Sequence, residues 1–446
     1  MNMLILIGCV VSSAFALQTA EVDDPQIMSI AFVGCNRVGW TGKHHPSTAN
    51  VAQLMATFED IATMDPPPTY FFFCGDLVRN EQDDQGQTLE SQLEPWFNLY
   101  ATSAMQGSET TLVPITGNHE TLLSKQTSDG TWIELPNPAT YPIWVSWLET
   151  HGFDTFAGNG PVVGGADLLT ASGAKMTYSF DSQDTGQGKI HFIVMDTDSI
   201  SSAVPTDQSC LQVQGAVPLP GWIAINWIEQ DIEAANQDPD ITYIFAIGHK
   251  PMRSFGASDP TGRDTIIDCD AFPFSTRLLD AFQSSTKFKG YLAAHVHLHD
   301  TVNLTNTTES AKWQVTAGNA GSQLDDRWEP RNPLGASSSP FFGYTIVRLH
   351  ESGKVFSDSY GRAVPDPYDA DKLTPTQRET TLRNILFMGV PCVGDVNEDG
   401  VVSVEDLLYI IRYFGITDGI ADQNDDGVTD INDLFLVTDH FLTSCE

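Results

Sequence analysis

The stretch that decides the fold is Tyr70-Phe71-Phe72-Phe73-Cys74-Gly75-Asp76, an apolar run followed at once by a glycine and an aspartate. A run this short and this apolar predicts a β-strand buried on both faces, as in a parallel sheet covered by helices. The glycine permits a tight turn directly after the strand. The aspartate therefore stands at the carboxyl end of a buried strand, where open α/β sheets bind their ligands.

Three further apolar runs end in the same way. Those at 111–115, 241–247 and 288–293 lead into Gly117-Asn118-His119-Glu120, Gly248-His249-Lys250-Pro251 and Ala294-His295-Val296-His297. We expect helices between the strands, at 47–64, 89–104, 222–235 and 274–284. This alternation predicts a layered α/β core over residues 28–350. Carboxylate, amide and imidazole side chains gathered at strand ends suit Fe, Zn or Mn.

The series Gly-Asp, Gly-Asn-His-Glu, Gly-His-x-Pro and Ala-His-Val-His, in this order, resembles the calcineurin-like metallophosphoesterases. Within that family it is most similar to the purple acid phosphatase branch, because the glycine-rich stretch at 315–321 follows the last histidine motif. The resemblance covers about residues 28–350. It implies a two-layer β-sandwich flanked by helices, with a dinuclear metal centre that hydrolyses phosphate mono- or diesters.

The resemblance also implies a role for each motif residue. The ligands of the two transition-metal ions would be Asp76 as the bridge, Asn118, His249 and His295 on one ion, and His297 on the other. His119 would protonate the leaving oxygen while a metal-bound hydroxide attacks phosphorus. Imidazole suits that task because its pKa lies near the working range.

The first motif of the family, Asp-x-His after the first strand, is altered here to Cys35-Asn36-Arg37. Three alternatives follow. In the first, the Cys35 thiolate or Asn36 replaces the aspartate and the dinuclear centre survives, with Zn or Fe favoured by the soft sulfur. In the second, one metal ion remains, and Arg37 supplies the missing positive charge to phosphate. In the third, the domain binds a phosphate or sugar phosphate without hydrolysing it.

The cysteines bear on this choice. If the first two strands are neighbours, Cys35 and Cys74 could form a disulfide, which would remove Cys35 as a ligand. Cys392 and Cys445 bracket the last segment of the chain and suggest a staple. The connectivity stays open.

Residues 395–414 and 422–441 are an internal duplication, each with an Asp-x-Asn-x-Asp-Gly loop followed by an amphipathic helix. Loop positions 1, 3, 5, 7, 9 and 12 offer oxygen atoms to calcium. The expected ligands are Asp395, Asn397, Asp399, Val401, Ser403 and Asp406 in the first loop, and Asp422, Asn424, Asp426, Val428, Asp430 and Asp433 in the second. Two such repeats resemble a type I dockerin. The resemblance implies a small all-α module at 392–446 that binds two Ca²⁺ and a cohesin-like domain on a scaffold or cell surface.

The remaining expectations concern location and partners. Residues 1–16 combine a short apolar run with Ala14-x-Ala16, which predicts a secretory signal and an extracytoplasmic protein. No other segment is apolar and long enough to cross a membrane. The formal net charge of −36 disfavours nucleic acid and anionic membranes as partners. Residues 351–391 are expected to be a tail and linker, with one further strand at 354–359.

Overall fold

The structure is a computed structural model. It describes residues 24–37, 50–80, 88–126, 132–137, 139–167, 169–198, 223–253, 266, 273–305, 312–324, 337–339, 341–362, 380–388, 394–396, 401–415, 421 and 428–442. The predicted signal at 1–16 lies outside these residues, as do Cys392 and Cys445.

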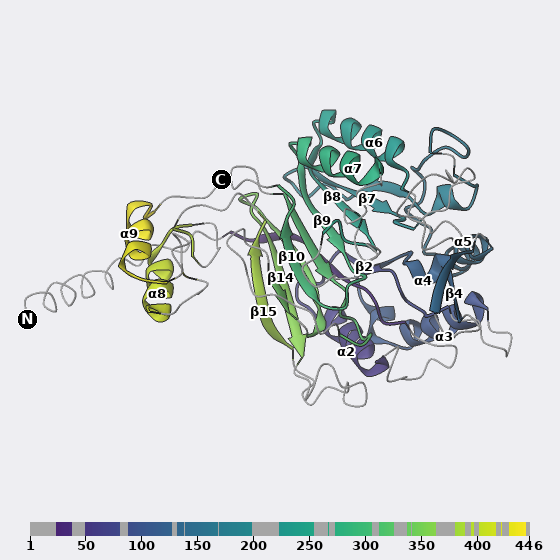
Figure 1. The fold of residues 1–446 in the computed structure, drawn as a ribbon, viewed down its shortest axis with the longest axis horizontal. Helices are drawn as coiled ribbons and strands as arrows, with labels where there is room; N and C mark the ends of the chain where they lie inside the picture. The colour runs from purple at the N-terminus through teal and green to yellow at the C-terminus, as the bar shows by residue number, and fades with distance from the viewer. Residues whose placement is uncertain are drawn as a thin grey trace, which may run out of the picture.

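One sheet has six strands in the order β15-β14-β13-β1-β2-β3 (Figure 1). Its members are β1 (Gln26–Val33), β2 (Tyr70–Cys74), β3 (Thr111–Ile115), β13 (Phe342–His350), β14 (Val355–Arg362) and β15 (Thr381–Phe387). Strands β1, β2 and β3 run parallel, whereas β13, β14 and β15 extend the sheet in antiparallel pairs. The parallel half therefore brings three carboxyl ends to the same edge.

The other sheet has seven strands in the order β12-β10-β11-β9-β8-β7-β6. Its members are β6 (Tyr178–Asp181), β7 (Lys189–Met195), β8 (Ile241–Gly248), β9 (Phe288–Ala293), β10 (His299–Asn303), β11 (Trp313–Ala317) and β12 (Ser337–Ser339). Strands β7, β8, β9 and β11 are parallel neighbours. Contacts of β1 with β11 and of β2 with β8 place the two sheets face to face.

The two faces of β2 show how the sandwich is held together. The Phe72 ring centre lies 5.4 Å from that of Phe192 in the facing sheet. The Phe73 ring centre lies 5.2 Å from that of Trp96, on the helical side. Alternate side chains of this strand thus enter two different apolar layers, which is why the whole run is apolar.

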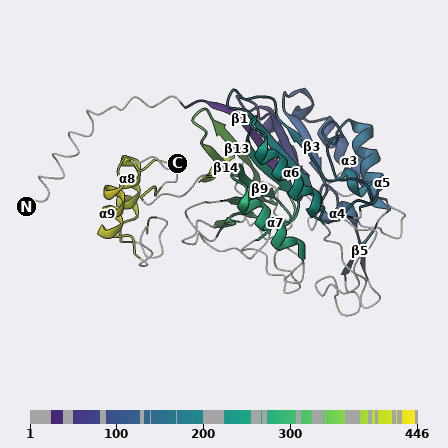
Figure 2. The ribbon, with the colours of Figure 1, turned by 90° about the horizontal axis from the view of Figure 1, so that it is seen from above.

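Helices cover both outer faces, as the two views in Figures 1 and 2 show. Helices α2 (Val51–Ala62), α3 (Leu89–Ala101) and α5 (Thr140–His151) lie on the side of the six-stranded sheet, and α6 (Ile225–Gln237) and α7 (Pro273–Ser284) on the side of the seven-stranded sheet. The short helix α4 (Asn118–Thr121) leads into a hairpin of β4 (Leu122–Gln126) and β5 (Trp132–Pro136). The predicted two-layer sandwich flanked by helices is confirmed.

The prediction of a tail and linker over 351–391 is wrong for the described parts of that segment. Strands β14 and β15 belong to the six-stranded sheet, so the domain continues past residue 350. Arg362 at the end of β14 is buried, pairs with Asp60 and donates to the Thr57 hydroxyl of α2 at 3.0 Å. Polar side chains can be buried in this segment because they have hydrogen-bonding partners. The segment therefore lacks the apolar pattern by which a buried strand is predicted from sequence.

The C-terminal residues form a separate small unit of α8 (Val404–Tyr413) and α9 (Ile431–Asp439) (Figures 1 and 2). It has its own apolar cluster around Val402, Ile410 and Val437. Each helix begins with a reciprocal cap, Ser403 with Asp406 and Asp430 with Asp433. The predicted ligands Asn397, Asp399, Asp422, Asn424 and Asp426 lie outside the described residues. Among the described helices of the whole chain, none combines the length and apolar character that a membrane span needs.

Candidate metal centre

The predicted ligands lie on loops that leave the carboxyl ends of strands in both sheets. Cys35 follows β1, Asp76 follows β2 and Asn118 follows β3. From the other sheet, His249 follows β8, and His295 and His297 follow β9. The parallel halves of the two sheets thus direct their ends to one place, as the strand-end pattern predicts.

Backbone hydrogen bonds join the loops after β1 and β2. The Cys35 amide donates to the Gly75 carbonyl at 3.0 Å, and the amides of Asn36 and Arg37 donate to the Asp76 carbonyl at 3.1 and 2.8 Å. The backbones of Cys35, Arg37 and Asp76 all have positive φ, at 64°, 55° and 56°. Each such residue costs on the order of 1–3 kcal/mol, so the surrounding contacts hold a strained arrangement in place.

Glycine is required where the loops after β2 and β3 touch. A Cβ atom on Gly117 would lie 2.4 Å from the Asp76 carboxylate and from its backbone nitrogen. Gly75 has φ +81°, and a Cβ there would lie 2.6 Å from the His249 ring. The glycines before the polar residues therefore allow the ligand-bearing loops to approach each other closely.

One group of ligand atoms surrounds the His249 ring nitrogen Nε2. It lies 2.9 Å from Asn118 Oδ1, 3.0 Å from His295 Nδ1 and 3.2 Å from Asp76 Oδ1. His295 Nδ1 is also 3.1 Å from Asn118 Oδ1. Atoms bound at about 2.1 Å to one ion and at right angles to each other would be about 3.0 Å apart. The spacing fits four ligands of a single metal ion.

The protonation of this group calls for a cation. His249 Nδ1 lies 2.7 Å from the Cys74 carbonyl, which can only accept, so the ring donates there and Nε2 presents a lone pair. Burial first of all lowers the pKa of His249 to about 4, despite the opposing charge of Asp76. Nε2 therefore faces two oxygen acceptors without a proton. A metal ion would satisfy all three atoms together.

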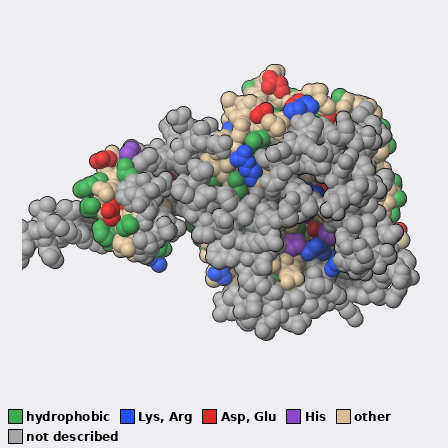
Figure 3. All heavy atoms as spheres, viewed as in Figure 1, with side chains coloured by type: hydrophobic (Ala, Val, Ile, Leu, Met, Phe, Trp, Pro, Cys, Tyr) green, Lys and Arg blue, Asp and Glu red, His purple; other side chains and the backbone are tan. Residues whose placement is uncertain are grey.

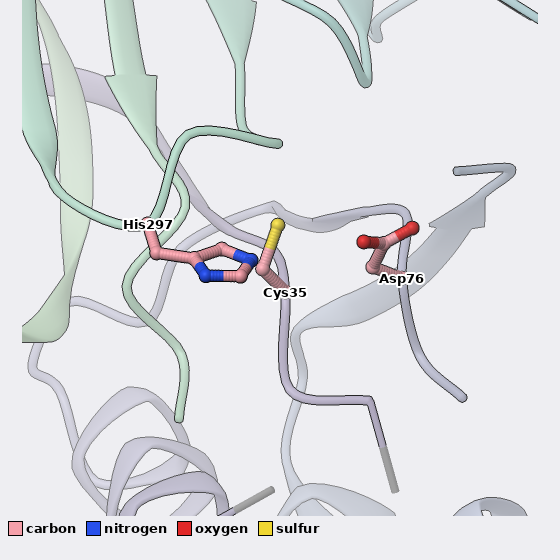
Figure 4. A group of neighbouring side chains, drawn as sticks. All are labelled: Cys35, Asp76 and His297. Carbon is pink, nitrogen blue, oxygen red and sulfur yellow. The ribbon is translucent and has the colours of Figure 1, made fainter. Parts of the chain in front are cut away.

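A second group is formed by Cys35, Asp76 and His297, with one ligand atom of each lying within 4.8 Å of the others (Figure 4). His297 Nδ1 donates to the Gln323 carbonyl at 2.8 Å, which leaves Nε2 as the ligand atom. The proposed Cys35–Cys74 disulfide is absent, since both are buried free thiols. Asp76 belongs to both groups, as a bridging carboxylate should.

Arg37 and His119 lie beside the second group. Arg37 Nη1 is 3.3 Å from His119 Nε2, and its Nη2 is 3.4 Å from His297 Nδ1. His119 donates from Nδ1 to the Arg79 carbonyl at 2.8 Å, which fixes the ring with Nε2 toward Arg37. Figure 3 shows histidine and charged side chains together in a recess on the face of the molecule seen there.

Asn36 lies beside the cluster, but its amide has another partner. Its Nδ2 donates to the carbonyls of Asn50 and Ala320, each at 3.2 Å. These bonds fix the loop after β1 against the segment that follows β11. The role of Asn36 as a ligand stays a prediction, whereas Cys35 is the member of the altered motif that the fold brings to Asp76 and His297.

Glu120, the fourth residue of Gly-Asn-His-Glu, is a further residue of the site to which the strand-end pattern assigns no role. Its carboxylate accepts three backbone N–H groups, from Asp76 at 2.9 Å, Gly117 at 2.7 Å and Val78 at 3.1 Å. Burial and then the Asp76 charge raise the pKa of Glu120, and these hydrogen bonds oppose the shift because they stabilise the carboxylate. Burial alone would raise the pKa of Asp76, but His249, His119 and Arg37 hold it well below its usual range.

Two family models match the chain. The model of the calcineurin-like phosphoesterases matches residues 28–299, more than half of the chain, and the chain belongs to that family. The dockerin type I model matches residues 393–442. No curated protein sequence matches the chain.

Three solved structures are similar to the chain. PhoD is 10% identical with a TM-score of 0.50, over 81% of this chain and 69% of PhoD. The purple acid phosphatase PPD1 from yellow lupin (Lupinus luteus) seeds is 13% identical with a TM-score of 0.46, over 75% of this chain. The present chain spans about half of the lupin protein, 51%. A dimetal phosphatase from Danio rerio is 11% identical with a TM-score of 0.48, over 76% of this chain and 98% of its own. At this identity the likeness to PhoD shows the fold alone.

The contacts of Glu120 generate a prediction. In Glu120→Gln, the amide NH₂ would face a backbone N–H that now donates to a carboxylate oxygen, so the loops bearing Asp76 and Asn118 should loosen. We expect zinc affinity, measured by competition with a chromophoric chelator, to fall by about 10–100-fold. The control is Glu94→Gln, at a half-exposed carboxylate of α3 that pairs with His151 and belongs to neither ligand group, and it should bind as the wild type does. Unchanged affinity in Glu120→Gln would contradict the positioning role.

Proposed function

We propose that the chain is a secreted, metal-dependent phosphoesterase that hydrolyses phosphate mono- or diesters and is held in place by its dockerin module. The single observation that carries this proposal is the pair of ligand groups that share Asp76. Asn118, His249 and His295 would hold one Fe, Zn or Mn ion with Asp76, and Cys35 and His297 would hold the other. Two ions at such a site supply activated water and neutralise charge on the transferred phosphoryl group.

The substrate must approach a very acidic protein, with a net charge of −36. An anionic phosphoester therefore needs positive charge concentrated at the site. Arg37 contributes it from the chain itself, because its guanidinium lies between the rings of His119 and His297. The Arg37 Nε donates to the Ser322 hydroxyl at 3.0 Å, which leaves the Nη atoms directed to the site. A planar guanidinium suits two phosphate oxygens at once.

His119 is positioned to transfer a proton. The Arg79 carbonyl holds its Nδ1–H, so Nε2, which faces Arg37 Nη1 at 3.3 Å, is the ring nitrogen on the side of the site. A proton carried on Nε2 would pass to the ester oxygen as its bond to phosphorus breaks, and the alcohol would leave neutral. Arg37, next to Nε2, would bind the phosphoryl oxygens while His119 serves the leaving group.

The alternatives for the altered first motif differ in what the site retains. A site that only bound phosphate would have no need of two ligand groups, yet the described residues keep both. The two ligand groups therefore favour the hydrolytic alternatives over the non-catalytic one. The hydrolytic alternatives with one or two ions share the same acid, His119, and the same guanidinium.

The dockerin module would act as the tether through its outer helix faces. Apolar side chains are exposed at equivalent positions of the two repeats, namely Val404 and Ile431, Leu408 and Phe435, and Phe414 and Phe441. Exposed apolar side chains repeated on two helices are typical of a docking surface. We propose a cohesin-like domain on a scaffold or cell surface as the partner, and two Ca²⁺ ions as the structural ligands of the loops.

The hydrolytic function is tested with the purified chain, its metals removed and then restored one at a time. We expect Fe, Zn or Mn to support turnover of nitrophenyl phosphate mono- or diesters. Asp76→Ala should lose activity by at least about 10³-fold, since both ligand groups lose a member. Folded wild-type protein that turns over neither ester class with any metal would favour the non-catalytic alternative.

The role of His119 predicts a dependence on the leaving group. His119→Gln should slow hydrolysis of an alkyl phosphate by about 10²–10⁴-fold, because a poor leaving group needs the proton. A nitrophenyl ester leaves as a stable phenolate, and its turnover should fall much less. An equal loss with both substrates would assign His119 to binding or metal support rather than to proton transfer.

Calcium binding predicts an effect confined to the C-terminal unit. Asp406 accepts the backbone N–H groups of Val396 and Ser403 at 2.6 and 2.7 Å, and it is an expected ligand. We expect calcium to raise the melting temperature of this unit in calorimetry and to be required for capture by immobilised cohesin domains. Asp406→Ala should weaken both effects, and the neighbouring exposed Glu405→Ala should not. A melting temperature and cohesin capture that do not change with calcium would refute the assignment of these loops as calcium sites.

A further inference from the structure

The second ligand group contains a thiol, Cys35, at the position where the family pattern has an aspartate. Cys35 leaves β1 in a left-handed conformation, with φ 64°. Its amide donates to the Gly75 carbonyl and its carbonyl accepts from the Ser322 amide at 2.9 Å, so both ends of the residue are fixed. Cys35 Sγ also accepts the backbone N–H of His295 at 3.1 Å. The backbone thus directs this sulfur toward the centre.

We propose that Cys35, Asp76 and His297 form a thiolate metal site, so that the two positions of the centre differ in chemistry and the sulfur-bearing position selects zinc, cobalt or ferrous iron over magnesium and manganese. Soft sulfur favours the first group of ions, and the second group prefers oxygen ligands. The other position, with Asn118, His249 and His295, offers only nitrogen and oxygen. The inference deepens the proposed function and rests on it only for the presence of metal in this centre.

The geometry supports coordination rather than a packing role for the thiol. Cys35 Sγ, an Asp76 oxygen and a His297 nitrogen all lie within 4.8 Å of each other (Figure 4). An ion with a sulfur at about 2.3 Å and nitrogen or oxygen at about 2.0–2.2 Å would draw these atoms together by a small movement of the side chains. The hydrogen bond from the His295 amide would in turn stabilise negative charge on the sulfur.

Cys74 offers an internal comparison. It is the last residue of β2, whereas Cys35 lies two residues after the end of β1. Like Cys35, it is a fully buried free thiol. Its Sγ lies 3.8 Å from the Phe72 carbonyl of its own strand, and among the described residues it belongs to neither ligand group. Cys74 is therefore a packing thiol, and a matched control for any effect of removing a buried sulfur.

The test is cobalt binding to the full-length chain, with the metal centre emptied by chelation and the dockerin loops saturated with calcium. We expect a near-ultraviolet band from sulfur-to-cobalt charge transfer when cobalt fills the sulfur-bearing position, whether the first or the second equivalent of cobalt binds there. Cys35→Ser should abolish that band and keep the visible cobalt bands of the nitrogen and oxygen position. Cys74→Ser should keep both. A charge-transfer band that persists in Cys35→Ser, or that is absent when the wild type holds two cobalt ions, would overturn the proposal.

A second measurement does not depend on any variant folding. Zinc X-ray absorption of the wild-type protein should show a sulfur scatterer at about 2.3 Å, with about one sulfur for every two zinc ions. A shell of nitrogen and oxygen alone would reject the thiolate site. In Cys35→Asp, which restores an oxygen ligand, we expect manganese to bind more tightly relative to zinc than in the wild type, by about tenfold or more.

These outcomes separate this proposal from the proposed function. Zinc bound through sulfur, in a protein that hydrolyses no phosphoester, would keep the thiolate site and reject the phosphoesterase activity. Efficient hydrolysis with no sulfur signature at full metal occupancy would keep the phosphoesterase activity and reject the thiolate site.

Discussion

The Asp76 carboxylate is the group on which the rest of the site depends. It stands on a strained turn at the end of β2, and it is the one residue common to both ligand groups. Its backbone also holds the neighbouring loops together. The Asp76 carbonyl accepts from the backbone amides of Asn36 and Arg37, and the Asp76 amide donates to the Glu120 carboxylate. Lone pairs of Asp76, Asn118 and His249 converge where the fold excludes water, and such an arrangement is costly without a cation. The β-sandwich brings these groups together, because it directs the strand ends of both sheets to the Asp76 carboxylate.

The altered first motif changes the charge balance of the centre without emptying it. Cys35 takes a position beside Asp76 and His297, while Arg37, two residues later, places a guanidinium between His119 and His297. In the proposed centre, one substitution would provide a softer ligand and the other a fixed positive charge that does not depend on metal. Both are held by backbone bonds to the loop after β2, and the two changes thus act on one small region. The first two alternatives drawn from the sequence differ in the number of metal ions, but the roles they give to Cys35 and Arg37 are compatible within one centre.

Much of the site could be predicted from sequence because its ligands follow apolar strands, and the carboxyl ends of parallel strands meet at one edge. The run at 70–76 predicted both the buried strand and the position of Asp76. Strand β15 was not predictable in this way, because it extends an antiparallel edge and its residues lack a continuous apolar pattern. Strand β14 was expected from residue 354, but its place in the main sheet follows from its pairing with β13 and β15, which no local pattern marks. Glu120 was missed for the same reason, since two of its three partners are backbone amides of the distant residues Asp76 and Val78.

The central claim is that two metal ions flank Asp76, one in each ligand group. The most direct measurement is anomalous diffraction from crystals of the full chain loaded with zinc, with data at the zinc edge. The account predicts two peaks about 3.5–4 Å apart, both in contact with the Asp76 carboxylate, one beside His249 and His295 and the other beside Cys35 and His297. A single peak at full zinc loading, or a second peak that does not touch Asp76, would contradict it.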